Sequence, residues 1–178
     1  MTSAHFVKKA RKDYPDFGIK KGDSYWYWEF AFGPTYKSKT RPKPSQLTRS
    51  EFLSTYLSIG ETLDGALQAA TCSDDIQSAI NEAKDSIEGL RDDTQSKLDN
   101  MPQQLQDADT GQLMQERIDQ LDEWSAGLDS VDLSTLQDLE SEEKDEIKDK
   151  KAEDTSDDVE EVLTTVKDEI FGVDPGIS

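Results

Sequence analysis

The short segment Arg41-Pro42-Lys43-Pro44-Ser45 limits what this chain can fold into more than any other feature of its sequence. Proline lacks the backbone N–H that a strand ladder needs, and it biases the preceding residue toward extended geometry. Aromatic residues typical of strands precede this segment, and apolar residues at helical spacing follow it. We therefore expect an α+β protein, in which a small antiparallel three-stranded β-meander precedes an elongated, acidic helical bundle with a coiled-coil-like region.

Three parts follow from this pattern. We expect a basic aromatic β-module at residues 1–44 and an amphipathic helical bundle at 45–131. The remainder, 132–178, should be an acidic segment that ends in an amphipathic helix.

The clearest strand signal is the run SYWYWEFAF at residues 24–32, because aromatic side chains favour pleated, half-buried surfaces. Segments 4–12 and 35–40 complete the predicted meander on either side of it. Side chains alternate across a strand, so one face of the central run should form the core of the sheet. The residues of that face are Trp26, Trp28, Phe30 and Phe32. Tyr25, Tyr27 and Tyr36 should then be the exposed rings.

Apolar residues at three- and four-residue spacing predict helices after the proline segment. Thr48 and Glu51 fit a capping box that starts the first helix, and Ser73 is the expected N-cap of the second. The second helix carries nearly four heptads of an a/d pattern, which predicts a seam within the bundle or with a second copy of the chain. The seam residues are Ile76, Ile80, Ile87, Leu90 and Leu98.

The later helices are less sharply marked. A third helix is expected at roughly 110–128, with five side chains facing inward: Leu113, Met114, Ile118, Leu121 and Trp124. Residues 141–158 fit either a solvated helix or a flexible linker. Ser156 is the expected cap of a last amphipathic helix.

Charge is divided unevenly between the two parts of the chain. Residues 1–50 hold eleven Lys or Arg against four acids, a net charge of +7. The whole chain carries -19, so residues 51–178 carry -26. Such asymmetry indicates a charged partner for at least one part, whereas acidic helices that only keep the protein soluble are the plainer explanation.

Most catalytic and metal chemistry finds no support in the sequence. The chain has one histidine, His5, and one cysteine, Cys72, so a cysteine-rich zinc site and an intrachain disulfide are excluded. The Gly-rich phosphate-binding and nucleophile motifs are absent, and the acidic stretch 129–140 lacks the glycine and the ligands of a calcium loop. We expect no enzyme activity, no cofactor and no metal.

Two features of the sequence predict where in the cell the protein is found. No apolar run approaches the ~18 residues of a membrane span, and a single thiol fits a reducing compartment. We expect a cytoplasmic protein with no membrane partner.

Aromatic residues interleaved with lysines on a small sheet are typical of surfaces that hold single-stranded nucleic acid, where rings stack on bases and amines meet phosphates. An acidic protein is the alternative partner of the same surface. The candidate contact residues are Lys8, Lys9, Arg11, Lys12, Tyr25, Tyr27, Tyr36, Lys37, Lys39 and Arg41.

The acidic helices admit two functional interpretations beside the solvated outer face. Their carboxylates could imitate the phosphates of duplex DNA in the groove of a DNA-binding partner. Alternatively, they could bind the chain's own basic module and screen it.

The N-terminal stretch AHFVKKARKDYPDFGIKKGDSYWYWEFAF, with YKSKTRPKPSQLTRSEF after it, resembles an uncharacterised family of small tailed-bacteriophage proteins. The resemblance covers about fifty residues and carries over no functional residue. It implies a phage-encoded protein that acts in the cytoplasm of an infected bacterium.

Three functions follow in order of preference. The first is a non-enzymatic phage accessory binding protein, whose basic module contacts nucleic acid or an acidic protein and whose helices contact a host or phage protein or form a homodimer. The second is an anti-defence DNA mimic that blocks a host nucleic-acid-binding enzyme. The third is a virion or assembly spacer.

Overall fold

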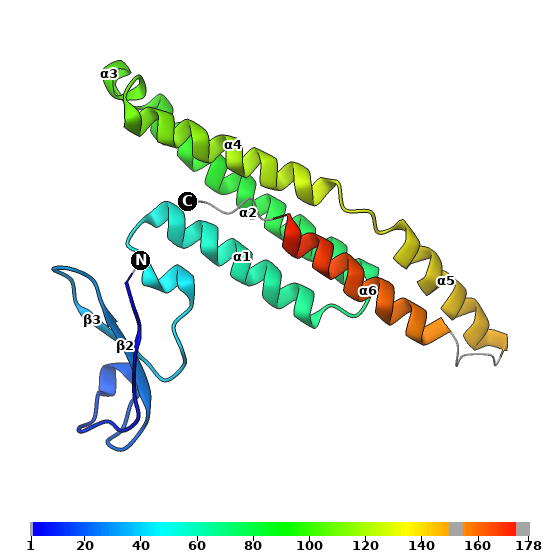
Figure 1. The fold of residues 1–178 in the computed structure, drawn as a ribbon, viewed down its shortest axis with the longest axis horizontal. Coiled ribbons are helices and arrows are strands. Elements are labelled where there is room, and N and C mark those ends of the chain that lie inside the picture. The colour runs from blue at the N-terminus through cyan, green and yellow to red at the C-terminus, as the bar shows by residue number, and fades with distance from the viewer. Residues whose placement is uncertain (1, 150–154, 174–178) are drawn as a thin grey trace. The chain divides into compact units, whose positions relative to one another are not determined.

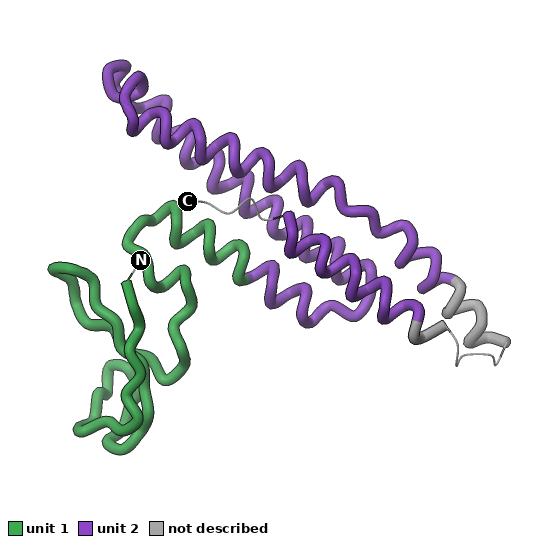
Figure 2. The backbone as a smooth tube through the Cα atoms, in the orientation of Figure 1, with its two compact units in different colours: residues 1–61 green, residues 62–178 purple. Residues whose placement is uncertain are grey.

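The chain changes from strand to helix at the proline segment, as the sequence predicts (Figure 1). The computed structural model describes the backbone of residues 2–149 and 155–173, and the side chains of residues 2–141 and 158–173. The chain divides into two compact units, residues 1–61 and 62–178 (Figure 2). The α+β class is confirmed.

A three-stranded antiparallel meander forms the centre of the first unit. Its strands are β1 (His5–Val7), β2 (Tyr25–Glu29) and β3 (Thr35–Ser38), in the spatial order β1-β2-β3. The register places Phe6 opposite Trp26, and Trp28 opposite Tyr36. The predicted meander is therefore confirmed.

The first strand is shorter than the predicted 4–12. The chain turns away after Val7, and the backbone N–H and C=O of Ala10 bond to Asp23 and Gly22, respectively. Residues 8–24 thus form a folded loop that includes a 3-10 helix, η1 (Pro15–Phe17), with Gly18 in the left-handed region behind it at φ 63°.

The two faces of β2 are both covered in part, which corrects the prediction of a single core face. The folded loop places Ala10 and Ile19 against Tyr25, with Tyr14 and Tyr27 packed around this small core. Tyr25 is consequently buried, with 8% of its surface exposed. On the opposite face Trp28 is buried, whereas Phe32 lies beyond the end of β2 and is fully exposed.

The first helix begins later than predicted. After a 3-10 helix, η2 (Pro44–Leu47), helix α1 runs over Glu51–Ala69. The Oγ of Ser50 accepts a hydrogen bond from Leu53 N at 3.3 Å, so Ser50 rather than Thr48 is the N-cap. Thr48 Oγ1 instead accepts from Ser50 N.

The second unit consists of helices. They are α2 (Ser73–Asp99), α3 (Gln103–Gln106), α4 (Asp109–Asp129), α5 (Ser134–Asp149) and α6 (Thr155–Gly172), preceded by the end of α1. Helix α2 packs along α4 and α5 packs on α6. The pairs Lys84–Asp129 and Arg91–Asp122 join α2 to α4, and their order along the two helices shows that the helices are antiparallel.

The inward residues of α4 differ from the predicted set at its first turns. Ile118, Leu121 and Trp124 are buried as expected, whereas Leu113 is 43% exposed. At this end of α4 the close neighbour is α3, because a Cβ added at Gly111 would clash with the Gln106 carbonyl oxygen.

The acidic segment is helical up to Asp149, where α5 ends, and residues 150–154 lie outside the described part of the chain. Helix α6 begins at Thr155, so Ser156 lies within the helix rather than at its cap. Val166 and Ile170 are buried in the second unit.

Candidate nucleic-acid interface

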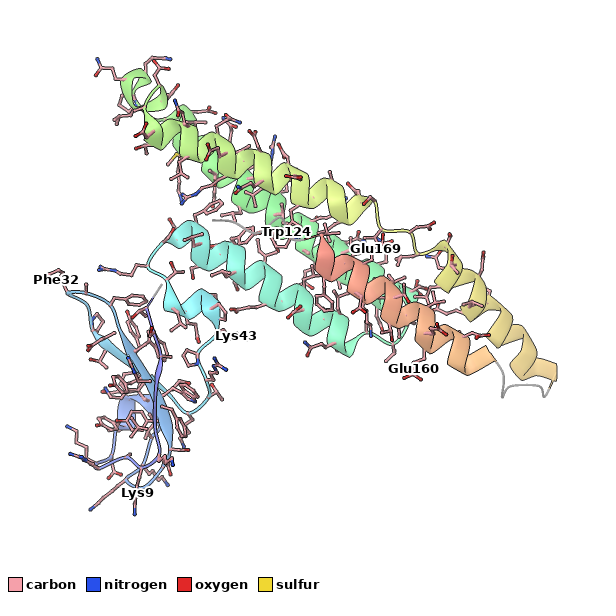
Figure 3. The ribbon with its side chains drawn as sticks, in the orientation of Figure 1. Lys9, Phe32, Lys43, Trp124, Glu160 and Glu169 are labelled. Atoms are coloured by element: carbon pink, nitrogen blue, oxygen red, sulfur yellow. The ribbon has the colours of Figure 1, made fainter. Side chains whose placement is uncertain are left out.

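One end of the sheet collects most of the positive charge of the first unit. The register pairs Val7 with Tyr25 and Trp26 with Ser38, so β1 and β3 finish where β2 starts. The segments that leave this end, residues 8–24 and 39–41, are called here the basic end. Figure 3 shows Lys9 at the basic end and Phe32 at the opposite end of the sheet. The basic end carries eight cationic residues against three aspartates: Lys8, Lys9, Arg11, Lys12, Lys20, Lys21, Lys39 and Arg41.

Two of the three aspartates organise the loop. Asp23 accepts a hydrogen bond from Lys20 N at 3.0 Å and pairs with the Lys39 ammonium at 3.4 Å. The bond from the Lys20 backbone, with the Lys39 side chain as a further cause, lowers the pKa of Asp23 below its ordinary value. Asp13 accepts a bond from Lys21 N at 2.6 Å. Both carboxylates are therefore occupied by the folding of the loop.

The lysines and arginine that follow β1 remain available for a ligand. Lys8, Lys9, Arg11 and Lys12 are exposed, and none forms an ion pair with a described residue. Lys12 Nζ lies 5.5 Å from the centroid of the Tyr14 ring, a cation–π distance that leaves its N–H donors free to reach outward.

Lys37 and Lys39 are more strongly engaged than the sequence indicates. Lys37 Nζ lies 4.8 Å from the Tyr14 ring centroid and 5.3 Å from that of Phe17. Lys39 is paired with Asp23. Both residues help to hold the loop. The exposed cations of the basic end that form no ion pair with a described residue are Lys8, Lys9, Arg11, Lys12, Lys20, Lys21 and Arg41.

The three tyrosines predicted as contact residues do not lie together on one exposed surface. Tyr25 is buried, and a hydrogen bond with Tyr14, together with burial, raises the pKa of Tyr25 above its ordinary value. Tyr27 is half-buried, and its ring stacks on His5 with centroids 5.2 Å apart. Tyr36 lies on the opposite face and is 40% exposed. The prediction that Tyr25 is an exposed contact residue is wrong, because the folded loop covers it.

The face that carries Tyr36 holds a set of rings from all three strands, called here the aromatic face. Its members are Phe6, Trp26, Trp28, Phe30 and Tyr36. The Phe6 and Trp26 centroids are 5.1 Å apart, and those of Trp28 and Tyr36 are 5.7 Å apart with nearly parallel planes. Arg41 Cζ lies 5.7 Å from the Trp26 ring centroid, which brings the basic end to the border of the aromatic face.

Phe6 and Trp26 were missed as candidate contact residues. Alternation along 24–32 marks the face of Trp26, but only the pairing register shows that Phe6 lies beside it. Phe6 is 50% exposed and Trp26 is half-buried. The sequence places Phe6 in a predicted strand, which by itself does not identify its neighbour across the sheet.

The turn between β2 and β3 carries the most exposed ring in the described part of the chain. Gly33 N bonds to Phe30 O at 2.9 Å, which closes a four-residue turn with Phe32 in its third position. Phe32 has φ 61°, a left-handed conformation that a residue with a Cβ rarely adopts. Thr2 and Arg49 bond to the carbonyls of Glu29 and Ala31 and hold the turn in place.

The predicted seam lies inside the second unit. Ile76, Ile80, Ile87 and Leu90 are buried and Leu98 is half-buried, on the helix that packs along α4. Because the chain covers these residues itself, they do not offer an exposed seam to a second copy.

The described residues form neither a metal cluster nor a membrane-spanning helix. No group of three or more His, Cys, Asp or Glu within them is arranged to hold a metal ion. None of the described helices is both long and apolar enough to cross a bilayer. Cys72, at the start of α2, is half-buried and forms no disulfide.

Comparison of the chain with protein-family models, curated proteins and solved structures finds no match. The resemblance to small phage proteins stays a prediction from the sequence.

Proposed function

We propose that this protein is a non-enzymatic, phage-encoded accessory protein that binds nucleic acid through the basic end of its N-terminal unit in the cytoplasm of an infected bacterium. One observation carries the proposal. The pairing register and the folded loop gather eight cationic residues at a single end of a small sheet, while two of the three acids there are occupied by backbone N–H groups.

A surface of this kind suits a polyanion. Binding of Lys or Arg to phosphates releases counterions, so the affinity falls steeply with salt, by a slope of roughly 0.9 for each phosphate neutralised on duplex DNA. Lys8, Lys9, Arg11 and Lys12 are the residues expected to make these contacts, because they are exposed and free of ion pairs with described residues. An acidic protein would meet the same charges but would not show the same regular dependence on nucleic-acid length.

The helices are proposed to contact a host or phage protein. Residues 51–178 carry a net charge of -26, which opposes direct contact with nucleic acid. The second unit therefore provides a surface for a partner, while the first unit provides the contact with the polyanion.

The test reverses charge at two exposed positions whose side chains form no ion pair with a described residue. In the full-length chain, Lys8→Glu with Lys9→Glu should reduce binding to fluorescent DNA and make its salt dependence shallower. The matched control, Lys8→Arg with Lys9→Arg, keeps the charge and should bind like the parent. If both double variants bind equally well, the basic end is not the nucleic-acid site.

A second candidate function is the DNA mimic, and one observation favours it. Helix α2 carries exposed carboxylates at three- to four-residue spacing, Asp85, Glu88 and Asp92, with Asp99 two turns further on. Such spacing places them along one side of the helix. Under this hypothesis Asp85→Asn with Glu88→Gln should abolish inhibition of a host nucleic-acid-binding enzyme, while the lysine variants remain active. If neither set of variants matters, the spacer function becomes the best explanation.

A further inference from the structure

We infer that the nucleic acid bound at the basic end is single-stranded, and that its unpaired bases stack on the aromatic face. This inference rests on the proposed function and names its ligand class. The sequence favours Tyr25 and Tyr27 as ring contacts, whereas this inference places the ring contacts on the opposite face of the sheet.

The rings of the aromatic face are presented in a row across the sheet. Phe6 is on β1, Trp26 and Trp28 are on β2, and Tyr36 is on β3. Phe6 and Tyr36 are 50% and 40% exposed, whereas Trp28, whose ring stacks with that of Tyr36, is buried. Buried Trp28 therefore supports the face, and the exposed rings form its outer surface.

Exposure of these rings is not needed for the fold. The first unit already has a core on the other face, where Ile19 is 1% exposed and packs with Tyr25. Large apolar groups gathered at a surface mark a contact site more often than scattered single ones do. Planar rings of several strands in one row fit the flat faces of successive bases.

Arg41 indicates how a single strand would lie. Its guanidinium is 5.7 Å from the Trp26 ring, at the border between the aromatic face and the basic end, and the residue is exposed. A guanidinium can rest on an aromatic ring and donate hydrogen bonds to a phosphate at the same time. Phosphates would follow the basic end while the bases lie on Trp26, Phe6 and Tyr36.

Duplex nucleic acid does not fit this arrangement. Its bases are stacked on one another and paired, so their faces reach a ring only after unpairing or flipping, which costs free energy. A single strand presents the faces without that cost. We therefore expect the phosphates of either form to bind at the basic end, but only the bases of a single strand to stack on the aromatic face.

The experiment compares oligothymidylate, oligouridylate and a duplex of the same length, by fluorescence anisotropy with the full-length protein. Phe6→Leu and Tyr36→Leu keep an apolar side chain but remove the ring. Each should weaken single-strand binding about 5- to 150-fold, from a stacking contribution of roughly 1–3 kcal/mol per base. Duplex binding should stay unchanged, and quenching of tryptophan emission by the single strand should diminish. Comparison of oligothymidylate with oligouridylate shows whether the single strand that binds best is DNA or RNA.

Two controls keep the result interpretable. Phe32→Leu removes a fully exposed ring at the opposite end of the sheet and should have no effect. Phe6→Tyr retains a ring and should bind like the parent, which separates loss of stacking from damage to the fold.

The outcomes separate this inference from the proposed function. Equal binding of single strand and duplex, unaffected by the leucine variants, overturns the stacking inference while the basic end remains a polyanion site. Absence of binding to every nucleic acid at low salt overturns both.

Discussion

Glu140 on α5 holds Ser73, the first residue of α2, through two hydrogen bonds. Its Oε1 accepts from Ser73 N and its Oε2 accepts from Ser73 Oγ, each at 2.6 Å. A carboxylate at this position satisfies an orphan N–H and opposes the positive end of the helix dipole. Cys72, which occupies the N-cap position, makes no side-chain capping bond. The cap of this helix therefore comes from 67 residues further along the chain.

In the first unit, too, a glutamate from a distant segment accepts two hydrogen bonds at the start of a helix. Glu61 Oε1 accepts from Ser45 N at 2.9 Å, and its Oε2 accepts from Ser45 Oγ at 2.8 Å, at the start of η2. In the second unit, the ammonium of Lys167 on α6 bonds to the carbonyl of Ala70 at 2.8 Å, just after the end of α1. Helix ends in both units are thus satisfied by side chains from distant segments.

Glu140→Ala should lower the free energy of unfolding. Ser73 is only 3% exposed, so its N–H would be left without a partner, at a cost of about 1–3 kcal/mol. Chemical denaturation of the single variants and of Glu140→Ala with Ser73→Ala gives the coupling between the two residues. Purely additive effects would contradict a direct interaction.

Asp75 should contribute to the pH dependence of stability. It accepts bonds from Thr71 N at 2.9 Å and Thr71 Oγ1 at 3.1 Å, and these bonds, the backbone one first, lower its pKa from the ordinary value of 3.8. A lowered pKa in the folded state means that the ionised form is favoured there. Its stabilisation is therefore complete above pH 3.8 and is lost as the pH falls below that value, through the pKa of the folded state.

The stability difference between the parent and Asp75→Ala should accordingly shrink as the pH falls through this window. Taking the difference cancels the general relief of charge repulsion that acid brings to a chain of net charge -19. Asp85→Ala, at an exposed position in the middle of α2, is the matched control. A difference that grows in acid would show that the sign of the shift is wrong.

Phe32→Gly should stabilise the first unit. A left-handed residue with a Cβ is strained by about 1–2 kcal/mol, and glycine removes that strain at an entropic cost of roughly 0.5–1 kcal/mol. The net gain is therefore between about 0 and 1.5 kcal/mol. No packing is lost, because the ring is fully exposed. Thermal unfolding should show Phe32→Ala close to the parent, since alanine keeps the strain. A gain in both variants would place the effect in the exposed ring instead.

The predicted seam should act within one chain. Ile87 is 1% exposed, and Ile87→Ala should cost about 2–5 kcal/mol, whereas Ile87→Val should cost about 0.5–1.5 kcal/mol. Sedimentation of the two folded variants should give the same mass as the parent. Dissociation of an oligomer, at unchanged stability, would assign the seam to contacts between copies.

Local patterns in the sequence determined the order of the elements. The aromatic run at 24–32 predicts β2, the prolines end the meander, and the heptads from Ile76 onward predict α2 and its buried stripe. These signals are reliable because side-chain alternation, proline geometry and helical periodicity act over a few residues. The concentration of cationic residues before residue 50 is likewise plain in the sequence.

Tertiary structure decided which surfaces are free. The loop 8–24 covers Tyr25, and only the register brings Phe6 beside Trp26. In the second unit, α5 supplies the cap of α2 through Glu140. Each of these contacts joins segments that are far apart in the chain, and no local pattern encodes which distant group will cover a face or satisfy a helix end. The sequence therefore determined what each segment becomes, and packing determined which of its residues a partner can reach.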